Sequence, residues 1–199
     1  MHVHLLDLNA GLPNRGTAAI VGVARELGHP VSVYDVRARG ELPPAGDGAW
    51  ILGGGPGSPL EPGPWRDPLL AALRARSARS LPTLAICYGC ELLGASLGGE
   101  LRRLREEREG VYPLRLLGTA GRDPLLRGLG RAAAYEKRSW GVFDVPARVL
   151  ATGPDGDAAA FRVGRSWGLI FHPEAGLGPD TEAVYTTVIP RFLASLSRA

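Results

Sequence analysis

The first hundred residues alternate between short apolar runs and segments with helical spacing, and this order restricts the fold more than any other feature of the chain. The first run stops at the turn residues from Asn9 to Pro13, and Gly28 stands where a glycine commonly ends a helix. We expect strands at residues 3–8, 31–35, 48–52 and 84–87, and helices at residues 17–27, about 68–79 and 91–97. Strands joined through helices by short links run parallel with helices against the sheet, so the sequence predicts an α/β fold with a mostly parallel sheet.

The second half of the chain is richer in strand-like segments. We expect strands at residues 111–117, 132–135, 148–151, 158–163 and 167–171, and a helix over residues 182–197. Pro190 lies within this helix and marks either its start or a kink, because proline lacks the N–H that a helix interior requires.

Length and composition predict one globular domain. The chain has 199 residues with no serine- or proline-rich linker, so we expect a single domain over residues 1–199. Hydrophobic residues make up 45% of the chain, and the apolar runs are far shorter than the roughly 20 residues that span a bilayer. The N-terminus lacks the positive region of a signal peptide. We therefore expect a cytoplasmic protein with no membrane partner.

The charge pattern argues against a nucleic-acid partner. The formal net charge is only +3, and residues 102–109 alternate between arginine and glutamate in a way typical of a solvated surface. A nucleic-acid-binding protein would instead gather one sign of charge on one face.

Cys87 lies where a short apolar run meets a small-residue turn and then a helix-compatible stretch. A sharp bend from strand to helix presents a side chain to solvent, and the free N–H groups of the first helical turn favour a thiolate and bind an anion. Cys87 is therefore a candidate nucleophile. The alternative is a buried structural cysteine at a strand end.

His172 and Glu174 supply an imidazole and a carboxylate two residues apart. Pro173 disfavours helix at His172, and in an extended segment residues two apart project in the same direction. A thiol that attacks a carboxamide needs a base and a group that orients the base. These residues predict a Cys87, His172 and Glu174 triad.

A glycine-rich turn follows the third predicted strand, at residues 53–59. It lacks the lysine and Ser/Thr ending of a P-loop and the spacing of a dinucleotide-binding loop. We interpret it as a turn whose glycines let backbone N–H groups approach a substrate closely. This turn, Cys87 and His172 all follow predicted strands, and in open α/β sheets functional groups gather at the carboxyl ends of parallel strands.

Cys87 and Cys90 form a C-x-x-C motif at a helix start, which is also compatible with a redox pair. That role would leave the glycine turn and His172 unexplained. Two cysteines and four scattered histidines do not form a zinc pattern, and we expect no metal and no cofactor. A disulfide between Cys87 and Cys90 is expected to form under oxidants and to silence the nucleophile reversibly.

Three motifs together resemble the class I glutamine amidotransferases. Residues 54–59 resemble the oxyanion turn of that family, residues 86–89 its nucleophile bend, and residues 171–174 its base and orienting acid. The resemblance covers essentially the whole chain and implies a flavodoxin-like three-layer sandwich with helices on both faces of the sheet. It implies that the N–H groups of Gly55 and Tyr88 form an oxyanion hole. It also implies that Ser139 and Trp140 match the segment whose backbone holds the amino acid end of glutamine.

The sequence departs from the family pattern near the substrate. Ala85 stands where the family usually has glycine, Glu91 where it has a substrate-binding glutamine, and Arg138 where relatives often have histidine. Glu91 is expected to be an anion that favours an ammonium group and repels a carboxylate. Glutamate at this position also occurs in the related γ-glutamyl hydrolases.

The resemblance implies hydrolysis of the glutamine side-chain amide through a cysteinyl γ-glutamyl thioester, with ammonia released for a separate synthetase subunit. One alternative is a γ-glutamyl hydrolase that acts on another γ-glutamyl amide. A further alternative is a catalytically silent amidotransferase-like module that binds a metabolite or partner.

Overall fold

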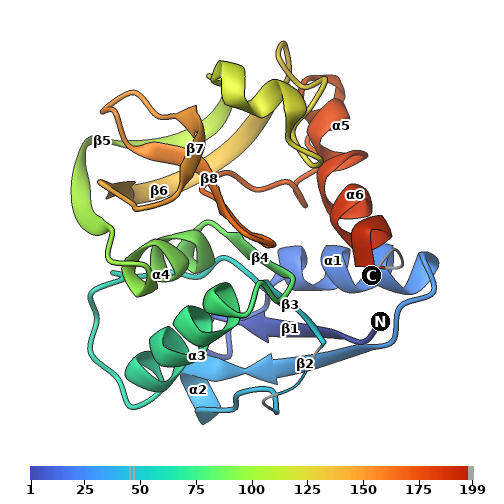
Figure 1. Ribbon diagram of the computed structural model, residues 1–199, viewed down its shortest axis with the longest axis vertical. Helices are drawn as coiled ribbons and strands as arrows, with labels where there is room; N and C mark the ends of the chain where they lie inside the picture. Colours follow the sequence, from blue (N-terminus) through green and yellow to red (C-terminus); the bar gives the residue numbers. More distant parts are fainter. Residues whose placement is uncertain (45, 47, 197–199) are drawn as a thin grey trace.

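A seven-stranded sheet forms the centre of the protein in the computed structural model, which describes residues 1–44, 46 and 48–196 (Figure 1). The strand order is β2-β1-β3-β4-β9-β8-β7. The bounds are β1 Val3–Asp7, β2 Val31–Asp35, β3 Ala49–Leu52, β4 Thr83–Ile86, β7 Arg148–Thr152, β8 Ala158–Val163 and β9 Ser166–Leu169. Strands β2, β1, β3, β4 and β9 pair in parallel, whereas β8 and β7 complete the sheet in antiparallel orientation.

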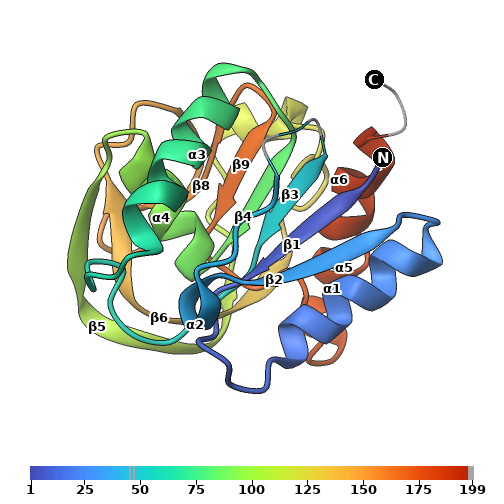
Figure 2. The same cartoon turned by 90° about the horizontal axis from the view of Figure 1, so that it is seen from below.

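Helices cover both faces of this sheet, which confirms the predicted α/β sandwich. The bounds are α1 Arg15–Glu26, α2 Val36–Arg39, α3 Arg66–Ala78, α4 Tyr88–Ser96, α5 Pro179–Tyr185 and α6 Val188–Ser195. Figure 2 shows α3 and α4 on one face and α1, α5 and α6 on the other. The parallel strands β3 and β4 are buried along their whole length, as strands covered on both faces must be.

Local signals define the ends of α1. The Asn14 side chain accepts hydrogen bonds from the N–H groups of Gly16 and Thr17 and so caps the start of the helix. Gly28 has a φ of +78°, which a glycine adopts without steric cost, and its N–H donates to the Arg25 carbonyl oxygen. The predicted helix ending therefore has the expected geometry.

The largest difference from the prediction is a two-stranded antiparallel sheet of β5 (Glu100–Pro113) and β6 (Ala133–Phe143). The sequence indicated only residues 111–117 and 132–135 as strands. The charged stretch at residues 102–109 lies in β5 and is largely exposed, so it lacks the apolar alternation of a half-buried strand. Cross-strand pairing such as Val111 with Tyr135 holds β5 in place.

Smaller differences concern short or divided helices. Helix α2 and the 3₁₀ turn at Gly118–Arg122 were not predicted from the sequence. The expected helix over residues 182–197 is divided into α5 and α6, and position 197 lies outside the described residues. Pro190 is the third residue of α6, where its missing N–H costs no helical hydrogen bond. Within the described ranges, every helix is too short or too polar to traverse a lipid bilayer.

Candidate active site

Cys87 is the single residue between β4 and α4. It has a φ of +50° and a ψ of −112°, a strained conformation for a residue with a side chain. The Cys87 N–H donates to the Leu169 carbonyl oxygen at 2.8 Å, which ties the bend to the neighbouring strand β9. Gly89 makes the sharp bend sterically possible, because a Cβ at that position would lie 2.7 Å from the Leu52 Cβ atom. The chain thus turns at Cys87 and points its side chain away from the sheet.

His172 and Glu174 follow β9, the strand beside β4. The His172 Nδ1 atom donates to Glu174 Oε1 at 2.7 Å, and the imidazole also hydrogen-bonds to the Cys87 side chain. The backbone N–H of His172 donates to the Tyr135 carbonyl oxygen at 2.8 Å, which fixes the segment against β6. The structure therefore brings the three predicted triad residues together.

The charges at this site favour a protonated His172. Burial disfavours the imidazolium, but the negative charge and hydrogen bond of Cys87, together with Glu174, outweigh it and raise the pKa of His172 to about 11. The arrangement is therefore an imidazolium beside the Cys87 sulfur, with Glu174 on the far ring nitrogen. A thiolate is the nucleophilic form of cysteine.

The glycine turn after β3 packs directly against this pair. A Cβ at Gly54 would lie 2.9 Å from His172 Cε1, and a Cβ at Gly55 would lie 2.3 Å from the Leu8 carbonyl oxygen. Only glycine therefore fits the turn at this distance. Tyr88 is the first residue of α4, so its N–H has no acceptor within the helix.

One cavity of about 950 Å³ contains the candidate site. All eight predicted site residues line it, namely Gly55, Cys87, Tyr88, Glu91, Ser139, Trp140, His172 and Glu174. The cavity lies at the carboxyl ends of the parallel strands, with β6 as its other wall. The Cys87 Sγ atom lies 3.6 Å from the Lys137 carbonyl oxygen, so the β6 backbone passes next to the thiol.

Glu91 differs from its expected state. Its side chain lines the cavity, yet the residue is only 4% exposed. Burial raises the pKa of Glu91 to about 8, although the Arg138 charge opposes this shift. The carboxyl group is therefore mostly protonated at neutral pH, contrary to the anion expected from the sequence. A neutral carboxyl carries one donor and one acceptor, as the amide of a glutamine does.

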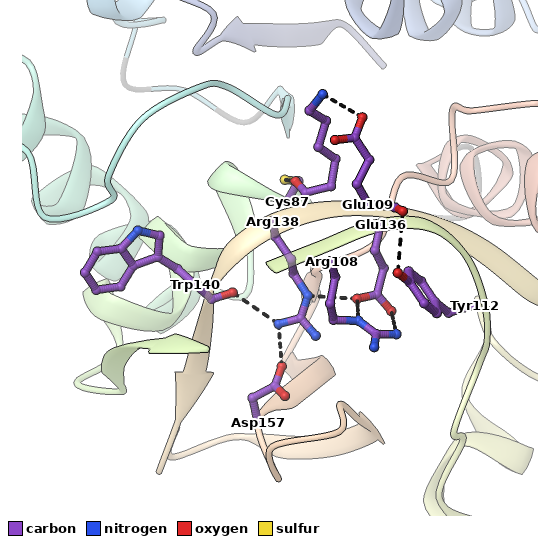
Figure 3. Close-up of polar contacts among 9 residues, drawn as sticks. Cys87, Arg108, Glu109, Tyr112, Glu136, Arg138, Trp140 and Asp157 are labelled. Atoms are coloured by element: carbon purple, nitrogen blue, oxygen red, sulfur yellow. Dashed lines mark hydrogen bonds and ion pairs between the residues drawn. The ribbon is translucent and has the colours of Figure 1, made fainter. Parts of the chain in front are cut away.

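Arg138 belongs to a buried charge network that the sequence did not predict (Figure 3). It donates from Nε to Glu136 at 2.8 Å and from Nη1 to Asp157 at 2.7 Å, and its side chain is fully buried. Arg108 adds a contact of 2.6 Å to Glu136. The network contains two arginines and two carboxylates, so its charges balance. The Arg138 charge lowers the pKa of Glu91, but burial outweighs this effect.

Part of the charged stretch in β5 belongs to the site rather than to an ordinary solvated surface. Glu107, Arg108 and Glu109 line the cavity, and the Ser139 hydroxyl donates to Glu107 at 2.9 Å. These residues reach the cavity because β5 pairs with β6 in antiparallel orientation. No pattern of apolar residues in the sequence indicates this pairing. Residues 105–109 are all charged, so the sequence has no alternation there that would have indicated a strand beside the site.

The two cysteines are unpaired and buried. Cys90 is completely buried, and this burial raises the pKa of its thiol well above the usual range. Among residues 1–44, 46 and 48–196, no cluster of three or more His, Cys, Asp or Glu side chains has the arrangement of a metal site.

Comparisons with known proteins found similar sequences and similar structures. The family model for "Glutamine amidotransferase class-I" matches residues 14–189. The chain is 34% identical over 158 residues to a GMP synthase [glutamine-hydrolyzing] of Pyrobaculum aerophilum. This match covers 77% of the chain and 28% of the relative. The corresponding enzyme of Thermus thermophilus is 36% identical over 137 residues, with 66% and 25% coverage. The chain thus spans about a quarter of the length of these curated relatives.

Solved structures share the fold. A glutamine amidotransferase from Thermotoga maritima has a TM-score of 0.75 at 20% identity and covers 100% of this chain and 85% of its own. A glutamine amidotransferase from Methylobacillus flagellatus also has a TM-score of 0.75, at 21% identity, with 87% and 70% coverage. These likenesses confirm the flavodoxin-like arrangement predicted from the sequence.

Proposed function

The chain belongs to the class I glutamine amidotransferase family, and on this basis we propose that it hydrolyses the side-chain amide of glutamine to glutamate and ammonia. The observation that carries the proposal is the convergence of Cys87, His172 and Glu174 in one cavity at a strained strand-to-helix bend. Each of the three groups has a defined part in acyl transfer from an amide.

In the first half of the reaction, the Cys87 thiolate attacks the side-chain carbonyl carbon of glutamine. A sulfur–carbon bond forms, and the carbonyl electron pair moves to the oxygen. The tetrahedral intermediate then collapses, the carbon–nitrogen bond breaks, and His172 gives its proton to the leaving nitrogen. Ammonia departs and a γ-glutamyl thioester remains on Cys87. Glu174 keeps the imidazole oriented through its 2.7 Å contact with Nδ1.

In the second half, neutral His172 takes a proton from a water molecule whose oxygen attacks the thioester carbon. The sulfur–carbon bond breaks, glutamate leaves, and the thiolate and imidazolium are restored. The sum is glutamine and water giving glutamate and ammonia. Both tetrahedral intermediates carry a negative oxygen, which the N–H groups of Gly55 and Tyr88 stabilise.

The amino acid end of glutamine binds between α4 and β6. Glu91 in its neutral form takes the place of a substrate-binding amide, and the backbone of Ser139 and Trp140 faces the same cavity. The Lys137 carbonyl beside Cys87 supports this assignment, because it brings the β6 main chain within reach of a bound substrate.

We further propose that the ammonia serves a synthetase partner. The relatives named as GMP synthases are about four times as long as the matched region, and their remaining length is not matched by this chain. A GMP synthase without its own glutamine-hydrolysing part is therefore the partner to test. Glutamine-dependent GMP formation by the mixture, absent from either protein alone, is the expected result.

A γ-glutamyl amide larger than glutamine is a second candidate substrate. The cavity of about 950 Å³ is favourable for a substituent on the amide nitrogen, and Glu91 differs from the family glutamine. Turnover of glutamine and of γ-glutamyl amines, measured side by side, separates the two activities.

The decisive experiment is replacement of the nucleophile. Cys87→Ala is expected to abolish ammonia release from glutamine, whereas Cys90→Ala removes a completely buried thiol beside it and is expected to keep the activity. Full activity of the Cys87 variant would refute the mechanism. If the wild-type protein hydrolyses no γ-glutamyl amide and Cys87 is not labelled by a glutamine-like electrophile, the protein is a silent binding module.

A further inference from the structure

Arg37 is buried beneath the glycine turn but takes no part in the cavity surface. It lies in α2, and none of the described residues that line the cavity belongs to this helix. Its side chain is only 8% exposed. Nη1 donates to the carbonyl oxygens of Leu8 at 3.1 Å and Pro56 at 2.5 Å, and Nη2 donates to Glu61 at 2.9 Å. One guanidinium thus joins the end of β1 to both sides of the turn.

The same guanidinium also stacks against the nucleophile bend. Its central carbon lies 5.0 Å from the centre of the Tyr88 ring and 5.7 Å from that of Trp65, which are cation–π distances. The Tyr88 hydroxyl in turn donates to the Ser58 carbonyl oxygen at 3.0 Å. Arg37 therefore forms hydrogen bonds with the glycine turn and stacks on the aromatic ring of Tyr88, the residue after Cys87.

The two segments that Arg37 joins carry the two proposed oxyanion donors. Gly55 precedes Pro56 and lies so close to the Leu8 carbonyl that a Cβ would be 2.3 Å from that oxygen. Leu8, which contacts Gly55, and Pro56, which follows it in the chain, both accept hydrogen bonds from Arg37. A glycine-rich turn has many accessible conformations, and fixed contacts on each side restrict them.

We propose that Arg37 is a positioning residue that holds the N–H groups of Gly55 and Tyr88 in register with each other for the oxyanion. This inference rests on the proposed hydrolysis of glutamine. Oxyanion stabilisation depends on donors that are already aligned before the charge develops, so a loose turn lowers the rate of the chemical step more than it lowers substrate binding. Lysine does not replace arginine here, because an ammonium lacks the planar fork and the flat face.

The first test separates positioning from general stability. We compare Arg37→Met and Arg37→Lys with Arg39→Met, at an exposed residue of the same helix that forms an ion pair with Glu41. Arg37→Met is expected to lower kcat by about tenfold or more with little change in KM, since one oxyanion donor contributes roughly 10²–10³ in rate. Arg37→Lys is expected to recover little of this loss, and Arg39→Met to behave as wild type.

The rate at which iodoacetamide alkylates Cys87 distinguishes positioning from a general structural role. A general disturbance of the site would change this rate, whereas a loss of oxyanion alignment alone would not. The thiolate displaces iodide from a saturated carbon, so no oxyanion forms and the rate is expected to be unchanged in Arg37→Met. Equal losses in kcat and in alkylation rate would overturn the positioning role, as would a folded Arg37→Met variant with full kcat. If Arg37→Met does not fold, Glu61→Gln weakens the contact to Nη2 from an exposed position and is expected to lower kcat by a smaller factor.

Amide hydrogen exchange tests the geometry without turnover. Loss of Arg37 is expected to accelerate exchange at Gly89, whose N–H donates to the Gly53 carbonyl oxygen of the turn at 3.2 Å, by more than tenfold, with no change in the interior of α1. Unchanged exchange at Gly89 would overturn the inference. If the wild-type protein releases no ammonia from glutamine, the proposed function fails, and the exchange experiment alone then decides whether Arg37 orders the turn.

Discussion

Gly16 lies against the carboxylate of Glu174: a Cβ on Gly16 would be 2.9 Å from the Glu174 Oε1 atom that accepts from His172. The first turn of α1 therefore forms part of the wall that fixes the orienting acid. Asn14 caps this helix, and its side-chain oxygen accepts a hydrogen bond from the backbone N–H of Gly16. The start of α1 and the proposed orienting residue Glu174 are therefore in direct contact.

This contact predicts a loss of activity without a loss of stability for Gly16→Ala. The methyl group displaces the flexible end of Glu174, whereas alanine stabilises a helix by about 0.5–1 kcal/mol relative to glycine. We expect kcat to fall about tenfold or more, because small displacements of catalytic groups are costly. Gly22→Ala is the matched control, since nothing lies within 4 Å of a Cβ there. Equal activity of the two variants would contradict the prediction.

Glu174→Gln is expected to lower kcat by at least about tenfold. The amide keeps the size of the side chain but removes the negative charge that stabilises the His172 imidazolium. The pKa of His172 is expected to fall, and the pH profile of kcat/KM is the measurement that reports it. Glu182→Gln, at a carboxylate that lines the same cavity from α5, is expected to leave the profile unchanged. A profile of Glu174→Gln identical to wild type would exclude the orienting role.

Glutamine binding is expected to weaken as Glu91 ionises. Below its pKa of about 8 the carboxyl group is neutral and resembles an amide, and above this value it is an anion at the proposed site of the substrate carboxylate. KM for glutamine should therefore rise above pH 8 in the wild-type protein and remain flat in Glu91→Gln. Steady-state kinetics from pH 6 to 10 test this, and a rise of equal size in both proteins would assign it to another group.

The same group predicts a pH dependence of stability. The pKa of Glu91 is raised from an unfolded value of about 4.3 to about 8 in the folded protein, so the folded state retains a proton that the unfolded state releases. The contribution of Glu91 to stability is complete below pH 4 and is lost as the pH rises to about 8. Relative to wild type, Glu91→Gln should gain stability between pH 5 and 8 in urea unfolding. A difference that is independent of pH would contradict the raised pKa.

Arg138→Met is expected to destabilise the protein by about 3–5 kcal/mol, because Glu136 loses one partner and Asp157 keeps a buried charge without its ion pair. The double variant Arg138→Met with Asp157→Asn should recover part of this loss. Arg102→Met is the control in the same hairpin, where the arginine is exposed and its removal is expected to have little effect. Urea unfolding at neutral pH measures all three, and a small loss in Arg138→Met would mean that the buried network contributes little.

The parallel sheet and the proximity of Cys87, His172 and Glu174 could be predicted because their signals are local. An apolar run followed by a turn and helical spacing is sufficient to place Cys87 at a strand end. Pro173 correctly indicates that His172 is not helical, but the segment is a turn and not the predicted extended chain, because the Ala175 N–H donates to the His172 carbonyl oxygen at 3.2 Å. Parallel topology then brings the two strand ends side by side, with no further information required.

The hairpin and its charges could not be predicted because they depend on partners distant in the sequence. Strand β5 has few apolar side chains toward a core and is held by its register with β6. Arg138 is buried where Glu136 and Asp157 pair with it, and Glu91 is mostly neutral because the assembled fold buries it. Charge state is therefore a property of the assembled fold and not of the residue type.

The buried arrangement of Arg108, Glu136, Arg138 and Asp157 has a consequence for behaviour on heating. The hydration of charged groups becomes less favourable at higher temperature, so the penalty for keeping these ions away from water decreases. Apolar contacts gain no comparable advantage. The attachment of the β5–β6 wall should therefore retain its strength on warming better than an apolar attachment would, and the cavity should keep its shape close to the temperature at which the sheet melts.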